Sequence, residues 1–77
     1  MLVKVKNTAP VEWIGKRRVS FAGLTGELNS DHSVLFDKMS RAKLPKLWVK
    51  HGEIEGYDPY MYVFNPNDLE KISEKGE

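Results

Sequence analysis

The chain has 77 residues and a mass of 8.8 kDa, which limits it to one domain. Hydrophobic residues make up 40% of it and charged residues 30%, a balance typical of a soluble globular domain. The absence of cysteine excludes disulfide bridges, cysteine-ligated zinc and thiol nucleophiles. No segment has the roughly 20 consecutive apolar residues that a membrane-spanning helix needs, so no membrane partner is expected.

The formal net charge is only +1, but the charges are divided unevenly along the chain. Residues 1–50 carry ten Lys and Arg against four carboxylates, whereas residues 51–77 carry two Lys against seven carboxylates. Such asymmetry marks a surface for nucleic acid or for an acidic protein. Alternatively, the acidic end folds beside the basic body and neutralises it.

The first half of the chain predicts a strand followed by a hairpin. Residues 2–6 alternate apolar and basic side chains, which is the pattern of a half-buried strand. Residues 11–14 and 17–21 are predicted to form an antiparallel hairpin around Gly15 and Lys16. Glycine at the first central position suits a type II′ turn, and such turns match the twist of the flanking strands.

A helix is predicted over residues 30–43. Asn29 or Ser30 provides an N-cap, and an apolar stripe recurs at helical spacing through the segment. The helix is expected to end at Leu44, because the residue before Pro45 is pushed out of the α region.

The last third of the chain predicts a second antiparallel strand pair, made by residues 46–50 and 60–64. Asn65 then caps a short C-terminal helix. Residues 1–72 are expected to form the single domain, and residues 73–77 a flexible tail.

Together these elements predict an α+β fold: a small, mostly antiparallel sheet of four or five short strands, one central helix and a short C-terminal helix. The residues expected to supply most of the core are Val3, Val5, Val11, Val19, Phe21, Leu35, Met39, Leu47, Val49, Val63, Leu69 and Ile72.

Neither of the two clusters that contain catalytic or metal-binding residue types is expected to act. Residues 30–32 read Ser-Asp-His, but adjacent residues cannot form a hydrolytic relay, and a helix cap explains them better. His51, Glu53 and Glu55 would share one face of a strand, yet Gly52 and Gly56 predict a turn that separates them. We therefore expect no enzyme activity, no metal, no cofactor and no small-molecule substrate.

Protein–protein interaction is the function that the sequence favours. Aromatic residues, Met and Arg are enriched at interface cores, and both faces of the predicted strand 60–64 are apolar. The predicted contact residues, for a protein partner or a second copy of the chain, are Arg17, Arg18, Trp48, Tyr57, Tyr60 and Tyr62.

Nucleic-acid binding is the alternative function. Single-strand binders combine a basic groove with stacking aromatic side chains, and basic residues flank aromatic ones in two stretches of this sequence. The residues that would contact phosphates are Lys16, Arg17, Arg18, Lys46 and Lys50.

The first 44 residues resemble a group of short, poorly characterised proteins encoded among tailed-phage head and tail genes. The residues that carry the resemblance are Val3-Lys4-Val5, Pro10-Val11, Gly15-Lys16-Arg17 and Gly26-Glu27. The resemblance implies a strand, a Gly-Lys hairpin and then a short helix beneath the sheet. It also implies a phage or prophage accessory protein, either a virion component or an inhibitor of a host protein. The expected location is the cytoplasm of a bacterial host or the virion.

Overall fold

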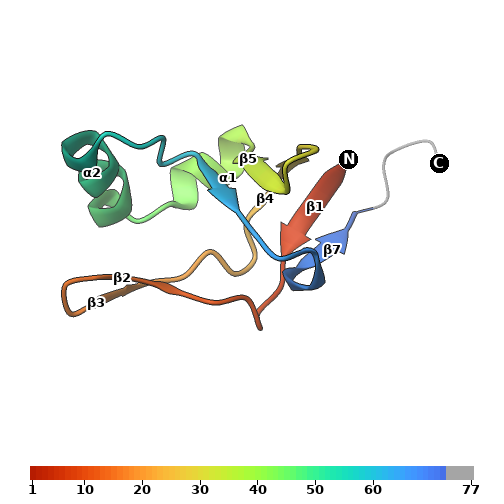
Figure 1. Cartoon of the computed structure of the whole chain (residues 1–77), viewed down its shortest axis with the longest axis horizontal. Helices are drawn as coiled ribbons and strands as arrows, with labels where there is room; N and C mark the ends of the chain where they lie inside the picture. Colours follow the sequence, from red (N-terminus) through yellow and green to blue (C-terminus); the bar gives the residue numbers. More distant parts are fainter. Residues whose placement is uncertain (73–77) are drawn as a thin grey trace.

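The computed structural model describes residues 1–72 and confirms an α+β fold (Figure 1). A five-stranded antiparallel sheet has the order β6-β5-β4-β1-β7, and a separate two-stranded ribbon is made by β2 and β3. The strands are β1 (Leu2–Val5), β2 (Glu12–Ile14), β3 (Arg17–Val19), β4 (Thr25–Leu28), β5 (Ser33–Phe36), β6 (Met61–Val63) and β7 (Leu69–Lys71). The helices are α1 (Lys38–Lys43), α2 (Lys46–Glu55) and the 3₁₀ turn η1 (Pro66–Asp68).

The predicted N-terminal hairpin is confirmed. Gly15 has a φ of 62° whereas Lys16 does not have a positive φ, as a type II′ turn requires. This turn places Trp13 directly opposite Arg18 in the ribbon. In Figure 1 the ribbon extends away from the five-stranded sheet, towards the side on which α2 lies.

The predicted helix over residues 30–43 is wrong in its first half. Residues 33–36 form β5, and only Lys38–Lys43 are helical, capped by the Asp37 side chain, which accepts from the Ser40 amide. A short apolar run fits both periodicities, and pairing of β5 with β4 and β6 selects the strand. The expected Ser-Asp-His helix cap is instead the turn before β5, where Asp31 accepts hydrogen bonds from Ser33.

The predicted strand over residues 46–50 is also wrong, since these residues begin α2. Alternation over five residues does not distinguish a strand from a helix, and the buried positions Trp48 and Gly52 have the i, i+4 spacing of a helix face. The strand at residues 60–64 is confirmed as β6, but its partner is β5.

The predicted C-terminal helix is reduced to one 3₁₀ turn. The Asn65 side chain caps it as expected, by accepting from the Asn67 amide. Residues 69–71 then form β7, which pairs with β1 and extends the sheet. The predicted flexible tail, residues 73–77, lies outside the described residues. Within residues 1–72, no helix is long and apolar enough to cross a membrane.

The core lies between one face of the sheet, the hairpin and α2. Its buried residues are Val3, Val5, Val19, Phe21, Leu24, Val34, Phe36, Leu44, Trp48 and Phe64. Four of these were predicted: Val3, Val5, Val19 and Phe21. The predicted core residues Leu35, Met39 and Val63 are instead exposed. Those predicted core residues that are only partly buried are Val11, Leu47, Val49, Leu69 and Ile72.

Gly26 makes the closest backbone approach inside the sheet, and its replacement by alanine is expected to be destabilising. A Cβ at this position would lie 2.8 Å from the Leu35 carbonyl carbon and 2.9 Å from the Phe36 Cα, both of which are backbone atoms held by strand pairing. We expect Gly26→Ala to lower the free energy of unfolding by about 1–3 kcal/mol, measured by urea denaturation. Glu27→Ala, on an exposed position of the same strand, is the control and should cost less than about 1 kcal/mol. Equal effects of the two substitutions would contradict the packing argument.

Candidate functional site: a groove beside strand β6

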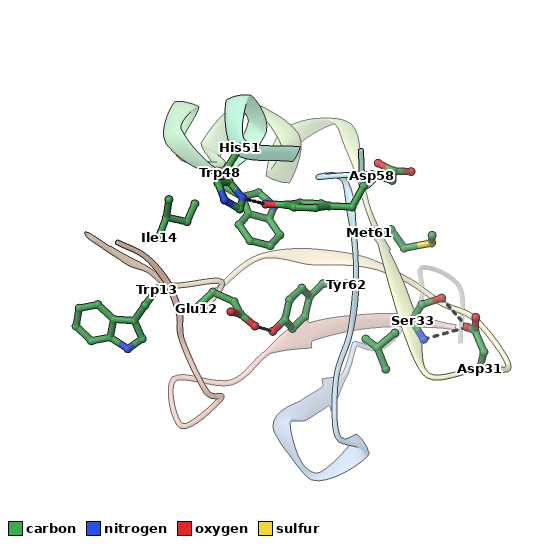
Figure 2. Close-up of a pocket in the computed structure, with 12 residues that line it drawn as sticks. Glu12, Trp13, Ile14, Asp31, Ser33, Trp48, His51, Asp58, Met61 and Tyr62 are labelled. Carbon is green, nitrogen blue, oxygen red and sulfur yellow. Dashed lines mark hydrogen bonds between the residues drawn. The ribbon is translucent and has the colours of Figure 1, made fainter. Parts of the chain in front are cut away.

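An open groove with a volume of about 610 Å³ lies beside β6, the edge strand of the sheet (Figure 2). One wall is the hairpin, through Glu12, Trp13 and Ile14. The residues of β6 itself, Met61–Val63, form the other wall. Successive residues of a strand point to opposite faces of the sheet. Because all three β6 residues line the groove, the groove reaches both faces and therefore passes around the free edge of β6.

Tyr62 joins the two walls. Its hydroxyl donates a hydrogen bond to the Glu12 carboxylate, fifty residues away in the sequence. Burial of the ring, together with this bond to Glu12, raises the pKa of Tyr62 above its ordinary value near 10. In Figure 2 the Tyr62 side chain points from β6 towards Glu12, while Met61 lies on the opposite side of the strand. The hairpin is therefore fixed to the sheet by a charge-assisted bond at the base of the groove.

Helix α2 and the loop that follows it close one end of the groove. The Trp48 Nε1 donates to the Pro59 carbonyl oxygen at 2.8 Å, and His51 Nδ1 shares a hydrogen bond of 2.7 Å with the Tyr57 hydroxyl. The Trp48 and Tyr57 ring centroids lie 4.9 Å apart. These contacts hold the aromatic end wall in one arrangement before any ligand binds.

The charge of the groove is negative. Among the described residues, its lining includes three carboxylates, from Glu12, Asp31 and Asp58, and no Lys or Arg. Hydrogen bonds from the Ser33 hydroxyl and amide lower the pKa of Asp31, so this carboxylate is ionised at neutral pH. The groove is thus an acidic and aromatic hollow on a chain whose overall charge is close to zero.

The structure brings together only part of the predicted partner-binding set. Tyr57, Tyr62 and Trp48 line the groove, although Trp48 is only 6% exposed and presents little surface to a partner. Tyr60 does not line it and instead lies under the Arg41 guanidinium, 5.1 Å from ring centroid to Cζ. Arg17 and Arg18 are exposed on β3 and are not among the lining residues.

The residues predicted to bind nucleic acid fall into two groups. Lys16, Arg17 and Arg18 are exposed on the hairpin. Lys46 and Lys50 lie one helical turn apart on the exposed face of α2, opposite the face that buries Trp48. Trp48 is therefore not on the same face of α2 as these two lysines.

Sequence reasoning missed Trp13 as a surface residue. Trp13 is 60% exposed, because the turn pairs it with Arg18 on the outer face of the ribbon. The exposure of Trp13 could have been predicted from the turn. A two-residue turn at positions 15 and 16 places residue 13 opposite residue 18, and directly opposite residues point to the same face of a ribbon. Because Arg18 is expected to face solvent, Trp13 must face solvent as well. No local sequence pattern could have predicted that Asp31 and Asp58 line the groove. The hairpin, the turn before β5 and the loop after α2 come together only in the folded chain.

The other chemical candidates do not form sites in the described part of the chain. Within residues 1–72, no group of three or more His, Asp or Glu side chains is arranged to hold a metal ion. His51, Glu53 and Glu55 all lie on α2, where Glu53 points away from the face that carries His51. Comparison of the chain with protein-family models, with curated proteins and with solved structures gives no match. Function must therefore be inferred from the groove itself.

The Tyr62–Glu12 bond predicts a loss of stability at alkaline pH. Because the folded-state pKa of Tyr62 is raised, its contribution is complete below about pH 10, the unfolded-state value, and decreases as the pH rises above it. We expect Tyr62→Phe to lower the free energy of unfolding at pH 7 by about 1–3 kcal/mol and to make its decline above pH 10 shallower. Urea denaturation between pH 7 and 11 measures both effects. Tyr60→Phe, outside the groove, should keep the wild-type slope; an unchanged slope in Tyr62→Phe would refute the coupling.

Proposed function

We propose that this domain is a non-catalytic protein-interaction module that binds a partner protein in the groove beside β6. The observation that carries the proposal is the groove itself, which combines aromatic rings, a methionine and carboxylates around an unpaired strand edge. Aromatic residues and Met are enriched in the buried centres of protein interfaces. Residues that dominate binding energy are most often Trp, Tyr and Arg.

Trp13 supports this proposal most directly. A tryptophan that is 60% exposed contributes little to the core of its own domain. Trp13 is one of the hairpin residues that line the groove, and its indole lies on the outer side of the ribbon (Figure 2). Val63 and Met61 are also exposed at the opposite rim. An apolar rim on both sides of a hollow gives a partner surface to bury.

The resemblance of the first 44 residues to phage-encoded proteins supplies the proposed setting. In that setting the module is a phage or prophage accessory protein, and its partner is either another virion component or a host protein that it inhibits. The first 44 residues span β1, the hairpin, β4, β5 and α1. A strand, β5, follows Gly26-Glu27 before the short helix α1 begins at Lys38.

The test uses the full chain immobilised as bait for lysate of a bacterial host, followed by affinity measurement on the retained protein. Trp13→Ala is expected to weaken binding at least tenfold, because truncation of a tryptophan that dominates an interface typically costs about 2 kcal/mol or more. Met39→Ala is the matched control: Met39 is 73% exposed on α1 and does not line the groove. Equal affinities of wild type and Trp13→Ala for every retained protein would refute the groove as the binding site.

The hairpin favours a second candidate function, nucleic-acid binding. Trp13 and Arg18 are directly opposite each other on the exposed face of the ribbon, which pairs a stacking ring with a phosphate-binding cation. If this surface binds labelled single-stranded DNA or RNA, affinity should fall steeply between 50 and 200 mM salt through counterion release. Arg17→Ala and Arg18→Ala should weaken binding, whereas Lys46→Ala, on the separate α2 face, should not. No binding at 50 mM salt would eliminate this candidate.

A further inference from the structure

We propose that the partner occupies the groove as an extended, basic segment that adds a strand to the free edge of β6. This inference rests on the proposed function and specifies its mode of binding and the chemistry of the partner. It is carried by three features of the structure: the hydrogen-bonding state of the β6 edge, the absence of charges that protect it, and the sign of the charge around it.

The backbone of β6 has one free hydrogen-bonding edge. The Phe36 amide donates to the Tyr60 carbonyl oxygen at 2.9 Å, the Phe64 amide donates to the His32 carbonyl oxygen at 3.2 Å, and Tyr62 is paired with Val34. In an antiparallel pair the hydrogen-bonded residues alternate along each strand. The backbone groups of Met61 and Val63 therefore point away from β5, and β6 has no second strand partner among the described residues.

The β6 edge is short, with three residues, but its side chains lack the charge that many natural sheets place on their edges. Exposed edge strands usually carry charged side chains, proline or a bulge, which prevent pairing with another chain. The other edge strand of the same sheet, β7, follows this rule, since two of its three residues are Glu70 and Lys71. In contrast, β6 consists of Met61, Tyr62 and Val63, and none of them is charged. The edge of β6 thus has the composition of a strand that is covered by a partner.

The negative charge around the β6 edge favours a partner segment that carries basic side chains. Glu12 lies on the hairpin wall, Asp58 at the α2 end and Asp31 at the far end, so carboxylates border the groove on three sides (Figure 2). Within residues 1–72, the lining has no Lys or Arg to neutralise them. A bound segment that alternates apolar and basic residues would place its apolar side chains against the exposed rims of the groove and its cations near these carboxylates.

The test uses an eight-residue peptide of alternating valine and lysine, titrated to millimolar concentration into the isotope-labelled full chain. Strand addition predicts that the amide signals of Met61 and Val63 shift and that their exchange with solvent slows at least tenfold, because these two amides become hydrogen-bonded. A valine–glutamate peptide should leave both signals unchanged. A fully N-methylated valine–lysine peptide, which keeps the charges but lacks the backbone donors, should not bind.

Two sets of protein variants test the edge and the charge separately. Val63→Pro removes an amide that β5 does not use and should weaken peptide binding at least tenfold, whereas Val63→Ala should not. Glu12→Gln combined with Asp58→Asn should also weaken binding at least tenfold. A double variant with the same change of net charge outside the groove, Glu53→Gln with Glu70→Gln, is the control and should bind like wild type. If Val63→Pro fails to fold, the N-methylated peptide decides the question.

The outcomes separate this inference from the proposed function. Peptide-induced shifts of Trp13 and Tyr57 with unchanged exchange at Met61 and Val63 would overturn strand addition and leave the groove as a partner site. Equal binding of the valine–glutamate peptide would overturn the basic class of partner. Slowing of the two amides with increasing protein concentration and no peptide would identify a second copy as the occupant and overturn the proposal. The absence of any shift would also overturn it, while the proposed function is judged independently by the Trp13→Ala capture measurement.

Discussion

The packing of Phe21 is the interaction on which the rest of the structure depends. Its ring is fully buried and contacts rings from three other elements: Phe36 of β5, Trp48 of α2 and Tyr62 of β6, with centroids 5.9, 5.1 and 4.7 Å away. A chain of 77 residues buries a small core, and without cysteine it has no disulfide to reinforce that core. One aromatic side chain just after the hairpin therefore connects the ribbon, the sheet and the helix.

The groove is a consequence of that arrangement. Because Phe21 anchors the hairpin over the inner face of the sheet, β2 is held near β6 without pairing with it, and the Tyr62–Glu12 bond fixes their separation. The ribbon and the five-stranded sheet do not form one continuous ladder, so β2 does not pair with the backbone groups on the outer side of β6. Polar backbone groups at such an edge remain available to water or to another chain. The candidate site is thus built from the same contacts that stabilise the core.

The uneven distribution of charge along the sequence suggested that the acidic end neutralises the basic body, but the described residues show little pairing of opposite charges. In the described part of the chain, the closest pairing of unlike charges is between the Met1 amino group and Glu27, at 2.7 Å, and both groups are half-exposed. Within residues 1–72, no Lys or Arg of the hairpin forms an ion pair with a carboxylate of the groove. A surface ion pair contributes about 1 kcal/mol or less, so the fold does not depend on joining them. The separation leaves an acidic groove and a basic hairpin each available for recognition.

The hairpin, the strand at β6, the α+β class and the inward positions of Val19 and Phe21 could be predicted from the amino-acid sequence, because turn chemistry and alternation act over two to five residues. Whether residues 33–36 and 46–50 form strand or helix depends on contacts with distant parts of the chain. Short segments satisfy both periodicities, and the choice is made by the partners available for pairing and burial. The groove, too, could not be predicted from the sequence. Its walls come from segments up to fifty residues apart, and neither the free edge of β6 nor the convergence of three carboxylates exists until the sheet order is set.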